Sequence, residues 1–141
     1  MSEMVGNKTE KFFSKSLTEI IKLFFGEEYL HSKIAMVLSI SALSMNIVDW
    51  LLLASFLRLP KETIVILHYN VYFGVDSTGS VKQTYSLPFI GLIILIINLF
   101  LAGYFYKLKE RIAAYVFLIT ALAIQLSLLI SVASVIIINY K

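Results

Sequence analysis

Three long apolar stretches constrain this chain more than any other feature. They cover residues 34–57, 87–106 and 112–138. Each is long enough to cross the roughly 30 Å hydrocarbon core of a bilayer, which takes a helix of about 20 residues. Only 15% of the 141 residues are charged and 59% are hydrophobic, whereas a soluble domain has about 25% charged residues. We therefore predict an all-α integral membrane protein with three transmembrane helices.

Residues 1–33 form a polar N-terminal segment that lacks the continuous apolar region of a cleavable signal peptide. Within it, residues 11–25 place apolar side chains at helical spacing with lysines between them, which predicts an amphipathic helix that ends at Gly26. Such a helix could lie in the membrane interface or pack on the cytoplasmic end of the bundle. The sequence leaves both interpretations open.

The distribution of lysine and arginine predicts the orientation of the chain. Eight basic residues lie in the N-terminal segment and in the turn between the second and third spans, against four in the central loop and at the C-terminus. Because cytoplasmic segments carry the excess of basic residues, we expect a multi-pass cell-membrane protein with its N-terminus in the cytoplasm. The loop at residues 58–86 and the C-terminus are then extracytoplasmic, and residues 34–141 form one three-span domain.

Four polar side chains stand inside the predicted spans: Asn46, Asp49, Asn98 and Gln125. The three amides lie near the middle of their spans, so they share one depth and could form hydrogen bonds between helices, each contributing about 0.6–2 kcal/mol. Asp49 lies about one turn further out, and the spans contain no basic residue to pair with it. Either the amides fix the register of the helices, or they belong to an ion or proton pathway that uses Asp49.

Each span also carries a face of small or polar residues, which should contact protein rather than lipid. The three faces are Ala35, Ser39, Ala42, Asn46 and Asp49; then Gly91, Leu95, Asn98 and Ala102; then Thr120, Ser127, Ser131 and Ser134.

The central loop has the composition of a small β-hairpin. Residues 63–75 are rich in β-branched and aromatic side chains, which is typical of a strand. Residues 76–80, DSTGS, have turn composition, and residues 81–85 could return as the second strand. A re-entrant segment is the alternative interpretation.

The same loop carries a family resemblance. Leu59–Pro60, His68-Tyr69-Asn70, Gly74 and Asp76, followed by a span, resemble the DUF1648 domain of multi-span bacterial proteins, which include the SdpI-like immunity proteins. The chain departs from that pattern in lacking its second proline, in two extra residues before the histidine and in a glycine shifted by one. The resemblance implies a largely uncharacterised family whose best-known members protect a cell from a secreted toxin. It carries over His68, Asn70, Gly74 and Asp76.

The residues themselves allow simpler roles. His68 could change charge between pH 5 and 8, and with Asp76 it could offer two metal ligands, which is a weak pattern. Asn70 and Asp76 are common turn and capping residues, and Gly74 could simply supply a positive φ. The chain has no cysteine, and it lacks a phosphate-binding glycine loop and the HExxH motif. We therefore expect no enzyme, no cofactor, no metal site and no nucleic-acid partner.

The leading hypothesis is a loop, including Tyr69, that recognises an extracytoplasmic partner or ligand. One alternative is a subunit or assembly factor of a larger membrane complex, including a homo-oligomer. Another is an oligomeric ion or proton transporter that uses Asp49.

Overall fold

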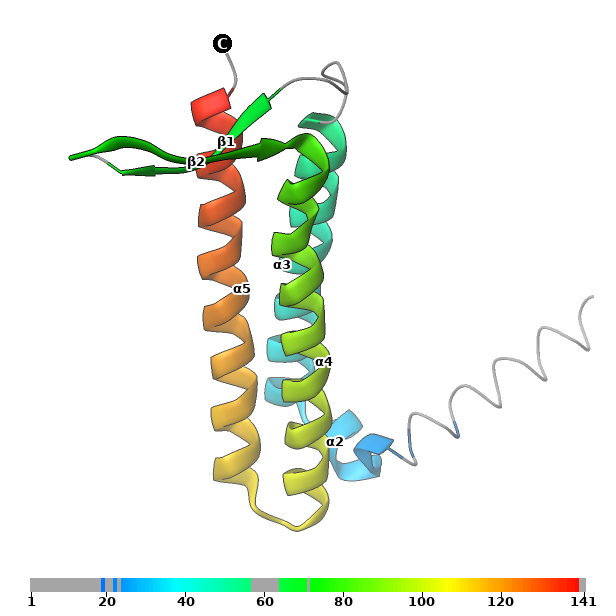
Figure 1. The fold of residues 1–141 in the computed structure, drawn as a ribbon. Coiled ribbons are helices and arrows are strands. Elements are labelled where there is room, and N and C mark those ends of the chain that lie inside the picture. Colours follow the sequence, from blue (N-terminus) through cyan, green and yellow to red (C-terminus); the bar gives the residue numbers. More distant parts are fainter. Residues whose placement is uncertain (1–18, 20–21, 23, 57–63, 71, 140–141) are drawn as a thin grey trace, which may run out of the picture.

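The computed structural model describes residues 19, 22, 24–56, 64–70 and 72–139. Within this part of the chain, three helices are long and apolar enough to cross a membrane. They are α3 (Lys33–Phe56), α4 (Ser86–Lys107) and α5 (Arg111–Asn139), and they lie side by side in an elongated bundle (Figure 1). Their ends lie within one residue of the predicted bounds. The prediction of three helices with span-forming length and composition is therefore confirmed.

A tight turn joins α4 to α5. Lys109 has a left-handed backbone with φ of 65°. The N–H of Lys109 donates to the carbonyl of Tyr106 over 3.1 Å, and the N–H of Glu110 donates to the carbonyl of Phe105 over 3.0 Å. These two bonds form the Schellman motif that satisfies the last carbonyls of a helix, with lysine at the position where glycine is usual. The chain therefore reverses within three residues.

Small residues let the three helices approach closely. Ala35, Ala102 and Ala114 are fully buried at one end of the bundle, and Ala42 and Ala121 are buried at its middle. The faces predicted on the first and second spans thus point into the bundle. The face on the third span points outward, because all of its residues are exposed: Thr120, Ser127, Ser131 and Ser134.

The central loop forms a two-stranded antiparallel hairpin from β1 (Ile64–Asn70) and β2 (Gly74–Ser80), followed by the 3₁₀ helix η1 (Val81–Tyr85). The predicted hairpin is confirmed, but the prediction of a strand at residues 81–85 and a turn at 76–80 is wrong. Asn70 accepts a hydrogen bond from the N–H of Tyr72 over 2.8 Å, and Gly74 supplies a φ of +82°. This pair turns the chain before the DSTGS segment, which therefore forms the second strand.

The predicted amphipathic helix at residues 11–25 lies mostly outside the described residues. Gly26, with φ of +78°, ends the preceding helical turn, and its N–H donates to the carbonyl of Lys22 over 2.9 Å. The short helix α2 (Glu27–His31) follows, which the sequence reasoning did not anticipate. It lies near the end of the bundle where α4 turns into α5 (Figure 1).

Candidate functional site

The hairpin is fixed to the end of α5 by one asparagine. Asn139 accepts a hydrogen bond from the N–H of Ile66 over 2.7 Å and donates its Nδ2 to the carbonyl of Ile66 over 2.8 Å. The side-chain amide thus satisfies the backbone N–H and carbonyl of Ile66 at the outer edge of β1, as a third strand would. Val65 and Val81 are buried beside this contact, and Ile136 packs against them. The base of the hairpin is therefore held by hydrogen bonds at the edge of β1 and by apolar packing on one side of the strands.

The outer part of the hairpin extends past the bundle. Figure 1 shows it crossing the ends of the helices and projecting beyond α5. At its tip, Tyr72 and Phe73 are 91% and 83% exposed. Large aromatic side chains are therefore presented to the surroundings on a support that is fixed at its base.

The two sides of the hairpin differ in polarity. Its strand pairing shifts twice near His68, but the two shifts cancel and the register is the same before and after them. On one side, His68 Nδ1 lies 3.3 Å from Asp76 Oδ2, and both side chains are open to solvent. Tyr69 pairs with Val75 on the other side, and each is about half exposed. Successive strand residues alternate sides, so an ion-pairing side and an apolar side lie back to back.

Besides Tyr69, which pairs with Val75, the predicted loop residues fall into two groups. His68 and Asp76 come together from opposite strands, whereas Asn70 and Gly74 form the turn. Among the described residues, no group of three or more His, Asp or Glu side chains is placed to hold a metal ion. The chemistry available here is hydrogen bonding, ion pairing and aromatic contact.

A second polar site lies inside the bundle. Asn46 donates its Nδ2 to Gln125 Oε1 over 3.2 Å and lies 3.1 Å from the carbonyl of Pro88. Gln125 donates its Nε2 to the carbonyl of Gly91 over 2.7 Å. These contacts join all three long helices. A Cβ on residue 91 would lie 2.5 Å from Leu128 Cδ1, 3.2 Å from Asn46 Nδ2 and 3.3 Å from Gln125 Oε1, so glycine leaves space for the leucine and for the two amides.

Asn98 does not belong to this amide layer. It donates its Nδ2 to the carbonyl of Ile94, one turn earlier in its own helix, over 2.9 Å. The layer of three amides expected from depth alone therefore contains only Asn46 and Gln125.

Asp49 lies one turn from Asn46 toward the hairpin end of α3. Its side chain is fully buried, and neither carboxylate oxygen has a hydrogen-bond partner among the described residues. The neighbouring Trp50 donates its Nε1 to Asn46 Oδ1 over 3.2 Å, and its ring stacks on that of Tyr85 at a centroid distance of 5.7 Å. Sequence reasoning identified Asp49 but missed the roles of Trp50, Tyr85 and Asn139.

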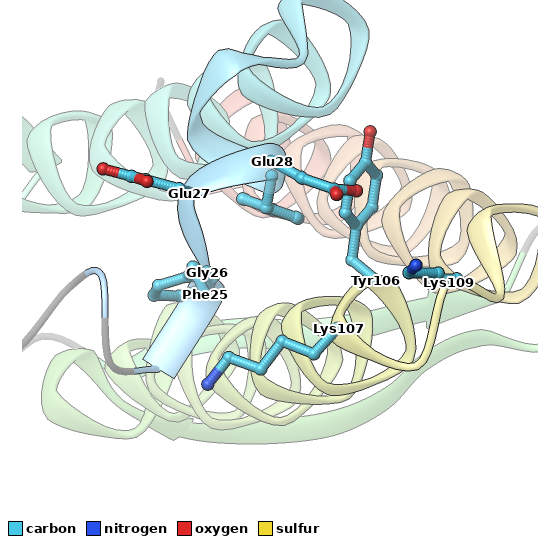
Figure 2. Close-up of a pocket in the computed structure, with 8 residues that line it drawn as sticks. Phe25, Gly26, Glu27, Glu28, Tyr106, Lys107 and Lys109 are labelled. Atoms are coloured by element: carbon cyan, nitrogen blue, oxygen red, sulfur yellow. The ribbon is translucent and has the colours of Figure 1, made fainter.

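At the opposite end of the bundle, a cavity of about 200 Å³ lies beside the contact between α2 and the end of α4. Figure 2 shows residues of α2 and of the segment just before it on one side, and residues from the end of α4 and the turn after it on the other. Tyr29 is buried beside it, with its hydroxyl 2.6 Å from Ser39 Oγ. Burial raises the pKa of the Tyr29 hydroxyl, and the hydrogen bond to Ser39 opposes part of that rise. The lining mixes acidic, basic and aromatic residues: Phe25, Gly26, Glu27, Glu28, Tyr29, Tyr106, Lys107 and Lys109.

Comparisons with protein-family models, curated proteins and solved structures found no match to this chain. The function must therefore be argued from the hairpin and the buried polar groups.

Proposed function

We propose that this chain is a non-enzymatic integral protein of the cell membrane that uses its hairpin to recognise an extracytoplasmic partner or ligand. The outer surface of the bundle supports the membrane location. Large apolar side chains are exposed along all three helices, for example Ile40 at 55%, Ile96 at 58% and Val116 at 55%. A continuous apolar surface of this extent is costly in water, and lipid would cover it.

The arrangement of basic residues supports the orientation. The α4–α5 turn, with Lys107, Lys109 and Arg111, lies at the same end of the bundle as α2. Of the basic residues in the N-terminal segment, the described Lys22 precedes α2, and Lys33 begins α3 at this end. By the positive-inside rule this end faces the cytoplasm, and the hairpin faces outward.

One observation carries the recognition proposal: the hairpin is fixed at its base by Asn139 and exposed at its aromatic tip. Exposed tyrosine and phenylalanine on an ordered support lose little conformational entropy on binding, and aromatic residues dominate many binding hot spots. The ion-paired side with His68 and Asp76 adds polar selectivity. The resemblance of these positions to the DUF1648 domain favours the same kind of role.

Photo-crosslinking in intact cells tests this proposal. A photoreactive residue at position 72, followed by mass spectrometry, should yield an adduct to one protein or peptide, and His68→Ala should remove it. The control places the same residue at Phe100, which is 54% exposed on the apolar side of α4. Adducts from position 72 that match those from position 100, or that contain only lipid, would refute recognition of a protein or peptide by the tip.

The outward face of α5 favours a second candidate, a subunit of a larger assembly. Ser127, Ser131 and Ser134 each donate their hydroxyl to a carbonyl one turn earlier in α5, so they present a small, satisfied surface. Small residues let transmembrane helices approach closely. Because the chain has no cysteine, Ser127→Cys can be crosslinked alone. It should give disulfide-linked dimers if α5 pairs with a second copy, and Leu126→Cys, about a quarter turn away at the same depth, should not.

An oligomeric ion or proton transporter is the third interpretation, because Asp49 is buried with no described hydrogen-bond partner. It requires ion flux in proteoliposomes that Asp49→Asn abolishes.

A further inference from the structure

The environment of Asp49 is incompatible with a bare carboxylate. The side chain has no exposed surface, and neither oxygen receives a hydrogen bond from the described residues. A buried ionised carboxylate without a partner is strongly disfavoured, because it loses hydration and gains nothing in return. The group must either bind a positive ligand or be neutral.

The neighbouring donors are already engaged. Asn46 Nδ2 lies against Pro88 and Gln125, and Trp50 Nε1 donates to Asn46. Gln125 Nε2 donates to the carbonyl of Gly91. The side-chain N–H groups of Asn46, Trp50 and Gln125 therefore donate to one another or to backbone carbonyls, and not to Asp49.

No charged side chain compensates from the packed helices. Residues 87–106 of α4 and 112–139 of α5 contain no Asp, Glu, Lys, Arg or His. Among the described residues at this end, the titratable side chains are those of the hairpin, of η1 and of its last residue: His68, Tyr69, Tyr72, Asp76, Lys82 and Tyr85, which stacks on Trp50. None of them forms a hydrogen bond with Asp49. In the described chain the ion pairs join Lys22 to Glu27 and Arg111 to Glu28, and His68 contacts Asp76; none of these contacts includes Asp49.

We propose that Asp49 is a proton-binding site, and that its carboxyl is held as the neutral acid inside the bundle at neutral pH. A metal ion would need several oxygen ligands, and the described residues offer no group of three His, Asp or Glu side chains. A proton needs only the one carboxylate. Hydronium gives the proton to Asp49, and water is released. This site is separate from the hairpin and does not depend on recognition by it.

Labelling with dicyclohexylcarbodiimide tests the proposal on the full chain in detergent micelles or liposomes. This apolar reagent reacts with protonated carboxyls: the acid proton moves to a carbodiimide nitrogen and the carboxyl oxygen adds to the central carbon. The adduct rearranges to a stable N-acylurea without a leaving group. An ordinary aspartate, with a pKa of about 3.9, is protonated in fewer than roughly one molecule in 1,000 at pH 7.5.

We expect labelling of Asp49 at pH 7.5 to be within about twofold of that at pH 5.5, because the acid form persists. The exposed carboxyl of Glu27, whose pKa is lowered by the hydrogen bond from Lys22, is the internal reference and should stay unlabelled at pH 7.5. Absence of the adduct in folded protein at pH 7.5, whether or not it forms at pH 5.5, would overturn the proposal.

A second measurement does not depend on the reagent. Asn replaces the acid by a neutral group of the same shape, so Asp49→Asn should fold. If Asp49 is neutral when folded and ionised when unfolded, the native state binds more protons, and the stability of wild type relative to Asp49→Asn falls as pH rises. A constant difference between pH 5.5 and 9 would contradict the proposal.

Discussion

Replacing Gln125 by leucine tests whether the buried amide pair holds the helices together. The change keeps the approximate size of the side chain and removes two hydrogen bonds, one accepted from Asn46 and one donated to the carbonyl of Gly91. An interhelical hydrogen bond in a membrane protein contributes about 0.6 kcal/mol on average and up to about 1.7 kcal/mol. The loss in the free energy of unfolding should therefore be about 1–3 kcal/mol.

A double-mutant cycle separates the shared bond from the rest. Gln125→Leu combined with Asn46→Leu should show a coupling energy of about 0.6–2 kcal/mol. Asn98→Leu is the matched control, because among the described residues the side chain of Asn98 donates to the carbonyl of Ile94 in its own helix, and its coupling with Gln125→Leu should be below about 0.5 kcal/mol. Unfolding in mixed micelles can be followed by the fluorescence of Trp50, the single tryptophan of the chain. Equal coupling in the two cycles would refute the assignment of an amide bridge.

Three further outcomes are expected. Asn139→Leu should speed hydrogen exchange at the Ile66 amide about two- to tenfold, because one hydrogen bond is worth about 0.5–1.5 kcal/mol; unchanged exchange would show that the edge contact is dispensable. Lys109→Gly should raise the free energy of unfolding by about 0.5–1 kcal/mol, because glycine adopts positive φ without strain, and Lys109→Ala should not. The hydrogen bond from Lys22 and its charge hold the pKa of Glu27 below the ordinary value. The Lys22–Glu27 pair therefore stabilises the fold at pH values above the ordinary pKa of a glutamate. This contribution is lost as the pH falls through the lowered pKa of Glu27. An NMR titration should show the midpoint of Glu27 rising in Lys22→Met, and an unmoved midpoint would contradict the pairing.

The features that depend on segment length and hydropathy could be predicted from the sequence. The features that depend on the rotation of a helix about its axis, or on contacts between distant residues, could not. The helix ends are set by apolar length and were predicted within one residue. The depth of Asn98 in the bundle follows from its position in the second span. The direction of its side chain, away from Gln125, depends on how α4 packs against its neighbours. The turn was placed too late because DSTGS has turn composition, whereas Asn70 and Gly74 close an earlier turn. The Asn139 contact joins residues 73 positions apart, which no local pattern indicates.

A short series of contacts links the hairpin to Asp49. The strand β2 continues directly into η1, where Gln83 accepts a hydrogen bond from the N–H of Ser80 over 2.9 Å. Tyr85 ends η1 and stacks on Trp50, the neighbour of Asp49. We expect this stack to order the last turns of α3, so Tyr85→Ala should let carbodiimide reach Asp49 faster, and Tyr85→Phe should not.

Labelling of Asp49 at the wild-type rate in Tyr85→Ala would show that the stack does not restrict access to the carboxyl. A faster rate in Tyr85→Ala alone would mean that any binding event that displaces η1 also changes exposure of the buried acid. The hairpin and Asp49 would then be coupled through one aromatic contact. Tyr85 ends η1, which follows the hairpin, and its ring stacks on Trp50 of α3, the helix that carries Asp49.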